Sequence, residues 1–355
     1  MARISSYSGN SNARGNTRQL CHRYRSLGFV LIALLAFLNV ALRRSSHDAL
    51  LLRPSGLERN GLHIPRSILT SEHLSLTFHP NTNGEKDGQV VTTTHAHSDE
   101  QKGKPKMLIA QYDAGHMVSS EHYLKILNAT STINRAYADK YRHDYLLLRG
   151  YYLHPPKWPF RRRANQPAAA LATYNKLALL HVALENEQYS SLLLLDSDAM
   201  IVDFTVDIAS AYSMQATRRK HGQPEDILLV AQRVSGNDNS WDVNAGVMLW
   251  NLKHTLVRKV LSNWERRCKW RVVTGASAED QKPLHTVLRR LGKSRPVLAL
   301  GGDDFRYADG TVIKHFVRPV GESSWNENTY DSSKRLRDVM ESVQRVCSAH
   351  NVTGS

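Results

Sequence analysis

The chain has 355 residues, 41% of them hydrophobic and 22% charged, with a formal net charge of +15. This length is enough for one large core or two small ones. A strongly basic chain often binds nucleic acid, but residues 1–66 hold ten arginines against only Asp48 and Glu58, which is +8 of the +15. The excess charge therefore lies beside an apolar run, and a membrane explains it better than nucleic acid does.

That run, residues 27–42, has a single polar residue, Asn39. A membrane-spanning helix needs about 20 apolar residues, and flanking arginines at 43 and 44 can lengthen a short span by snorkelling. A cleaved signal peptide is the alternative, but no small-x-small cleavage site follows. We predict a cytoplasmic tail at 1–26 and a signal-anchor transmembrane helix at 27–42. The protein would then be a single-pass type II protein of the Golgi membrane, with the endoplasmic reticulum also possible.

The polar, turn-rich residues 43–105 predict a largely disordered lumenal stem, followed by a catalytic domain at 106–355. Within that domain, Cys268 and Cys347 could form a disulfide or stay free.

Two glycosylation sequons begin at Asn128 and Asn351. Such triplets also occur by chance, so they give only weak support to a secretory route.

The domain alternates strand and helix patterns. Strands are predicted at 107–110, 145–153, 192–195, 226–232, 244–251 and 311–317, and helices after Ser119-Ser120, at 168–187, at 253–267, from Ser277, and at 332–347. In the last helix the predicted apolar face is Leu336, Val339, Met340, Val343 and Cys347. This alternation predicts an α/β fold with a mostly parallel central sheet and flanking helices.

Two acidic residues end the leucine strand. Residues i and i+2 of a strand point the same way, so Asp196 and Asp198 should project together from the carboxyl end, where α/β sheets bind ligands. Two carboxylates there would repel one another unless they share a cation. A hard divalent cation that carries a diphosphate suits the site. The alternative is an ordinary strand end with helix-capping acids.

Phosphatases also place such a motif after an apolar strand. Their motif continues with Thr or Val two residues after the second Asp, where this chain has Met200. That class is set aside.

Five segments, in order, resemble glycosyltransferase family 34, which contains galactosyl-, mannosyl- and xylosyltransferases. The matching segments are EHYLKILNATSTINRAYADKYRHDYLLL, YNKLALLHVALENEQYSSLLLLDSDAMI, NAGVMLWN, SAEDQKPLHTVL and KHFV. They extend from about residue 107 to residue 320. In the first segment, Asn134, Tyr137 and Tyr145 stand at matching places.

The resemblance implies a GT-A nucleotide-sugar-binding fold with Mn²⁺ held by Asp196, Asp198 and His315. Imidazole with carboxylates suits Mn²⁺ better than Mg²⁺. Alone, His315 would more often be an ordinary strand histidine.

The same resemblance places Gln281 near the reacting carbon and Asp280 on a sugar hydroxyl as candidate catalytic residues. Ser277-x-x-Asp280 is also a capping box, so a purely structural role remains open for Asp280.

The implied donor-binding residues are Lys176, Asp196, Ser197, Asn244, Gly246 and Arg318. Lys176 could instead lie on a solvated helix face, and Asn244 and Gly246 could simply begin a strand. The chain departs from the family where a glycine and a lysine usually follow the histidine, because Arg318 and Val320 stand there. Arg318 could supply the missing cation to the diphosphate.

These features predict a retaining glycosyltransferase that uses a nucleotide sugar, UDP-galactose being the first candidate, and a glycan or glycoprotein acceptor. No nucleophile is evident, which favours a front-side attack in which the leaving phosphate takes the acceptor's proton. The alternative is a catalytically weak partner subunit of a Golgi glycosylation complex, and either protein could be a homo- or hetero-oligomer. Nothing beyond net charge suggests nucleic acid.

Overall fold

The computed structural model describes residues 57–59, 62–65, 68, 75–79, 106–113, 121–153, 171–212, 227–234, 239–276, 278–291, 297–300, 304–305, 310–316, 332–350 and 352. The predictions for the tail at 1–26, the anchor at 27–42, Asn351 and Arg318 lie outside these ranges. Among the helices that the structure describes, none is both long enough and apolar enough to cross a membrane.

The strands are β1 (Leu57–Arg59), β2 (Leu62–Ile64), β3 (Ser75–His79), β4 (Lys106–Asp113), β5 (Asp144–Arg149), β6 (Tyr189–Leu195), β7 (Ala199–Ile201), β8 (Leu229–Arg233), β9 (Val243–Asn251), β10 (Val297–Leu300) and β11 (Ile313–His315). The helices are α3 (Glu121–Tyr141), α5 (Asn175–Glu185), α7 (Val257–Thr274), α8 (Gln281–Arg289) and α9 (Ser332–His350), and a 3₁₀ turn (Ala172–Tyr174) leads into α5.

A seven-stranded sheet forms the centre, in the order β10-β8-β9-β6-β4-β5-β3. Strands β4, β5, β6, β8 and β10 run in one direction, and β9 and β3 run against them. The fold is therefore α/β with a mostly parallel central sheet, as predicted. The antiparallel β9, inserted between β6 and β8, makes the sheet mixed.

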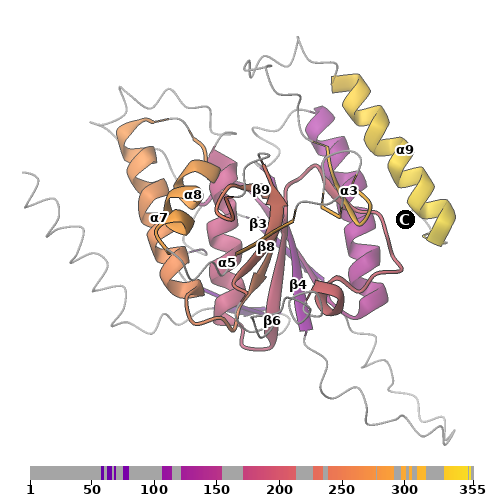
Figure 1. Ribbon diagram of the computed structural model, residues 1–355. Coiled ribbons are helices and arrows are strands. Elements are labelled where there is room, and N and C mark those ends of the chain that lie inside the picture. The colour runs from indigo at the N-terminus through magenta and orange to yellow at the C-terminus, as the bar shows by residue number, and fades with distance from the viewer. Residues whose placement is uncertain are drawn as a thin grey trace, which may run out of the picture. The chain divides into compact units, whose positions relative to one another are not determined.

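Helices cover both faces of this sheet: α5, α7 and α8 lie on one face, and α3 and α9 on the other (Figure 1). The leucine run of β6 shows why both faces need cover. Leu192 and Leu194 belong to the core on the α5 side, whereas Leu193 and Leu195 belong to the core on the α3 side. A strand that is buried on both faces has no polar position, which explains the unbroken run.

Secondary structure that the structure describes begins before the predicted boundary at residue 106. Strands β1 and β2 pair with each other, and β3 joins the edge of the central sheet beside β5. Leu62, Ile64 and Ile68 are buried in the core. The prediction of a largely disordered stem across 43–105 is therefore wrong for these segments, because their few apolar residues are buried against the domain.

Several helix boundaries differ from the prediction, including those of α7 and α8. Helix α7 continues to Thr274 and ends at Gly275, whose left-handed backbone (φ 68°) lets its amide reach the carbonyls of Arg271 and Val272. Helix α8 begins at Gln281 rather than near Ser277, and its N-cap residue Asp280 makes no side-chain capping bond.

Both cysteines of the domain are free thiols. Cys268 is buried in the core on the α5 side, and Cys347 packs against the core on the α3 side. Because the sheet separates them, the two thiols form no bridge.

Candidate functional site

The two aspartates lie in the turn between β6 and β7. After this turn, β7 pairs antiparallel with β11, in a register that places His315 opposite Ala199. This short ribbon brings a histidine from late in the chain to the end of the leucine strand. The amide of Phe316 also donates to the carbonyl of Asp198 at 2.9 Å, which fixes the two segments together.

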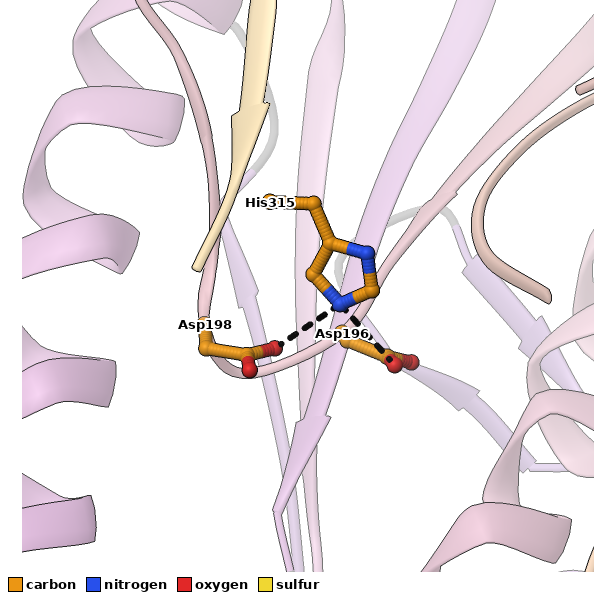
Figure 2. Close-up of side chains that lie close together, drawn as sticks. All are labelled: Asp196, Asp198 and His315. Carbon is orange, nitrogen blue, oxygen red and sulfur yellow. Dashed lines mark ion pairs between the residues drawn. The ribbon is translucent and has the colours of Figure 1, made fainter. Parts of the chain in front are cut away.

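The imidazole of His315 points between the two carboxylates (Figure 2). Its Nε2 lies 3.5 Å from Asp196 Oδ2 and 3.3 Å from Asp198 Oδ1. One ligand atom from each of the three residues lies within 4.8 Å of the others. The structure therefore brings together the three residues that the sequence predicted as metal ligands.

The spacing of these atoms fits a divalent ion. Neighbouring ligands of an octahedral ion with bonds of about 2.1 Å lie about 3 Å apart, so the two distances from the imidazole to the carboxylates need only a small contraction. Burial alone would lower the pKa of His315, but Asp198 and Asp196 raise it to about 9. Without an ion, a proton on the imidazole holds the carboxylates together; with one, that proton must leave.

Each carboxylate also has a cation from the chain itself. Lys176 Nζ lies 3.0 Å from Asp196 Oδ1, and the guanidinium of Arg335 pairs with Asp198 Oδ2. Burial would raise the pKa of both aspartates, but these cations and His315 hold both below the usual range. The expectation that the pair needs a shared ion to offset its repulsion is therefore wrong.

Lys176 joins the aspartate turn to the start of α8. Its ammonium lies 2.8 Å from Asp280 Oδ2 and 5.5 Å from the ring centroid of Tyr112. The side chain is 2% exposed, so the alternative of a solvated helix face is wrong. Asp280 uses its carboxylate on Lys176 rather than on a helix cap, and burial raises its pKa although Lys176 opposes the shift.

Helix α3 and strand β4 hold the backbone of the turn. Thr130 Oγ1 donates to the carbonyl of Ser197 at 2.8 Å, and Asn134 Nδ2 donates to the carbonyl of Ala199 at 3.0 Å. Gln111 Nε2 donates to the same Ala199 carbonyl at 3.2 Å. These bonds fix the backbone of the turn that carries both aspartates. Ser197, which was predicted to bind the donor, takes part in them through its backbone carbonyl.

Strand β9 lies beside the turn. The carbonyl of Gly246 accepts from the amide of Asp196 at 2.8 Å, and the amide of Gly246 donates to Asn244 Oδ1 at 2.7 Å. Gln281 Oε1 accepts from the amide of Ala245 at 3.1 Å. Gly246 thus contacts the aspartate turn directly, and the side chains of Asn244 and Gln281 contact the backbone of β9 beside it.

Gly246 is required by the position of the histidine. A Cβ added there would lie 2.6 Å from both ring nitrogens of His315 and closer still to Cε1. An alanine at 246 therefore requires the buried ring of His315 to move away from its place between the aspartates.

We expect Gly246→Ala to displace His315 and to weaken Mn²⁺ binding at least tenfold. Disturbing a group that orients a metal ligand typically costs about 10- to 100-fold in metal affinity. Electron paramagnetic resonance of free Mn²⁺ would measure the affinity. Gly150→Ala is a poor comparison because that glycine has a positive φ of 114°; Ala278→Ser, a small change beside α8, is the control. Unchanged Mn²⁺ affinity in Gly246→Ala would show that His315 is not a ligand.

Sequence reasoning missed two residues of the site. Tyr112 donates its hydroxyl to Asp196 Oδ1 at 2.5 Å. Its place at the site could have been predicted from the parallel pairing of two strands. Because β4 runs parallel to β6 with Gln111 beside Leu195, the next residues, Tyr112 and Asp196, fall at the same edge.

Arg335 gave a weaker signal. The buried positions of α9 include Arg335, Val339, Ser342 and Val346, whereas Met340 is 49% exposed. The buried face is thus rotated from the one predicted by the apolar residues. The only local indication of this buried face in the sequence is that Arg335 stands four residues, about one helical turn, before Val339.

No family model matches the chain, and no curated protein matches its sequence. Comparison with solved structures finds glycosyltransferases of low similarity to the chain. One is a glycosyltransferase involved in the glycosylation of the major capsid of PBCV-1, with 13% identity and a TM-score of 0.41 over 67% of this chain and 100% of that one. Another is the bifunctional glycosyltransferase WbbM, with 16% identity and a TM-score of 0.35 over 69% of this chain and 52% of that one.

A third is the glycosyltransferase GlyE of Streptococcus pneumoniae TIGR4, with 14% identity and a TM-score of 0.35 over 70% of this chain and 64% of that one. The chain thus spans about half of WbbM and just under two thirds of GlyE. Similarity of this extent carries no inference on substrate or mechanism, which must come from the site.

Proposed function

We propose that the chain is a metal-dependent, retaining glycosyltransferase with a GT-A fold, similar to family 34, that takes its sugar from a nucleotide donor. The convergence of Asp196, Asp198 and His315 at the carboxyl edge of the sheet carries this proposal. Such an edge is where α/β folds bind nucleotides, and the ligand set suits Mn²⁺.

A divalent ion bound there would neutralise the charge that develops on the departing diphosphate. The side chains around it orient the donor. Lys176 fixes Asp196 and Asp280 relative to one another. Because Gln281 Oε1 is held by the amide of Ala245, its Nε2 is left to donate to a sugar bound over β9.

Donor and acceptor belong to the same proposal. UDP-galactose is the first candidate donor, with UDP-xylose, UDP-glucose and GDP-mannose as alternatives, and the acceptor is a glycan or glycoprotein. We place the enzyme in the Golgi membrane through residues 27–42. Protease digestion of the C-terminus in intact microsomes would contradict that topology.

The test is donor hydrolysis by the full chain in detergent, with each of the four nucleotide sugars and either Mn²⁺ or EDTA. We expect one donor to be hydrolysed with Mn²⁺ and none with EDTA. Hydrolysis that persists undiminished in EDTA would contradict the metal requirement.

One observation favours a second candidate, a catalytically weak partner subunit. Lys176, Arg335 and His315 satisfy the aspartates without any ion, and His315 and Asp198 are 4% and 8% exposed. A folded protein that hydrolyses none of the four donors would support this role.

A further inference from the structure

The C-terminal helix contributes a buried arginine to the candidate metal site. Arg335 is 5% exposed. Its Nε donates to the carbonyl of Phe316 at 2.6 Å, its Nη1 donates to the hydroxyl of Tyr123 at 3.1 Å, and its Nη2 donates to Asp198 Oδ2. The guanidinium also lies 5.0 Å from the ring centroid of Tyr123. All three nitrogens are engaged, so this side chain has one fixed orientation.

The two carboxylates divide their oxygens in the same way. In Asp196, Oδ1 takes Lys176 and Oδ2 faces His315. In Asp198, Oδ2 takes Arg335 and Oδ1 faces His315. One oxygen of each aspartate is thus fixed by a chain cation, and the other is turned toward the site.

Arg335 also links the two segments that carry the candidate metal ligands. Through Nη2 it holds the side chain of Asp198, in the turn after β6. Through Nε it holds the carbonyl of Phe316, the residue directly after His315 at the end of β11. Arg335 of α9 thus adds a side-chain link between Asp198 and the residue next to His315, beside the backbone bond from the Phe316 amide to the Asp198 carbonyl.

We propose that Arg335 is a positioning residue for the divalent-ion site, and that α9 is consequently a functional part of that site. It acts through Asp198 and His315 rather than on the substrate, because it is buried. This role rests on the proposed function, since it presumes that the Asp-Asp-His group binds an ion.

The shape of the guanidinium is what the role requires. Arginine presents its donors in a rigid planar fork, whereas lysine is a compact point charge on a flexible stem. A lysine at 335 would keep the positive charge beside Asp198 but could not hold both Asp198 and the Phe316 carbonyl in one plane. Charge and geometry can therefore be separated by substitution.

The test compares wild type, Arg335→Met, Arg335→Lys and Arg337→Met in the full chain in detergent. Arg337 is an exposed residue of the same helix and serves as the control. Mn²⁺ alone is the probe, and its affinity is measured per folded molecule by paramagnetic resonance. We expect Mn²⁺ affinity to fall 10- to 100-fold in Arg335→Met, as for other groups that orient metal ligands. Arg335→Lys should also weaken binding, and Arg337→Met should match wild type.

Two results would overturn the role of Arg335. Unchanged Mn²⁺ affinity in both Arg335 variants would make the arginine purely structural. Tighter Mn²⁺ binding in Arg335→Met, with wild-type affinity in Arg335→Lys, would make it a cation that competes with the ion. If Arg335→Met does not fold, Arg335→Lys decides by the same measurement.

The same experiment separates the two proposals. Wild-type protein that binds no Mn²⁺ contradicts the metal-dependent function and the role of Arg335 together. Wild-type protein that binds Mn²⁺ as tightly as every variant contradicts only the role of Arg335.

Discussion

We expect Asp198→Asn to lower donor turnover about 10²- to 10³-fold, the loss typical of removing one preorganised electrostatic group. The substitution keeps the shape of the side chain but removes a formal charge from the ligand set. It also leaves Arg335 buried without its anion, which is costly. The variant should therefore melt at a lower temperature than wild type even in EDTA.

Adding Mn²⁺ and UDP completes this test. Wild type should gain several degrees in melting temperature by binding linkage, and Asp198→Asn little or nothing. Asp338→Asn, at a half-buried position of α9, is the control for the loss of one negative charge and should behave as wild type. If Asp198→Asn gains as much as wild type, Asp198 has no role in metal binding. If Asp198→Asn melts at the same temperature as wild type in EDTA, the burial of Arg335 does not depend on the charge of Asp198.

The position of Asp196 and Asp198 at the carboxyl edge of the sheet was predictable from the sequence. Asp196 and Asp198 follow a doubly buried run, which places both at the carboxyl edge of the sheet. They lie in the turn after β6 rather than in the strand, so the period-2 geometry that was expected to align them does not apply there. His315 could be assigned only through the resemblance, because nothing local marks it. Its register opposite Ala199 arises from pairing between segments more than a hundred residues apart.

The partners of the chain cations could not be predicted, because they are distant in sequence; Lys176 was placed at the site only through the resemblance. Lys176 looks like any lysine near the start of a helix, and only the packing of α5 on the sheet turns it toward Asp196 and Asp280. Arg335 has its partner Asp198 137 positions earlier. Local patterns report which face of a helix is apolar, not which charge that face will meet.

The fold shows the same limit. The long strands β4, β6 and β9 and helices α3, α5 and α7 have enough residues to display their periods. Strands β7 and β10 were missed, because three or four apolar residues give no period. Strand β3 was missed because it directly precedes a polar, turn-rich segment and was grouped with it, although it adds to the sheet edge at β5. The positions of such short strands are determined by the strands with which they pair.

The largest effect on stability should come from Lys176→Met. Lys176 is 2% exposed and is the cation for two carboxylates, at 3.0 Å from Asp196 and 2.8 Å from Asp280. Methionine fills a similar volume but leaves both acids without this charge. Breaking a buried ion pair by removing one partner costs about 3–5 kcal/mol. Urea unfolding in EDTA should show a loss of that size in the free energy of unfolding.

The matched control is Lys259→Met, an exposed lysine of α7, which should change the free energy of unfolding by no more than about 0.5 kcal/mol. The double variant Lys176→Met/Asp280→Asn tests the cause. If the loss comes from stranded charge, removing one of the two stranded carboxylates should return part of it, so the double variant should be more stable than Lys176→Met alone. A loss in Lys176→Met no greater than in Lys259→Met would show that Asp196 and Asp280 find other partners. An additive double variant would show that the lysine stabilises the fold by packing rather than by charge. Only a loss of about 3–5 kcal/mol in Lys176→Met that is partly restored in the double variant would identify Lys176 as the counter-ion of Asp196 and Asp280 when no ion is bound.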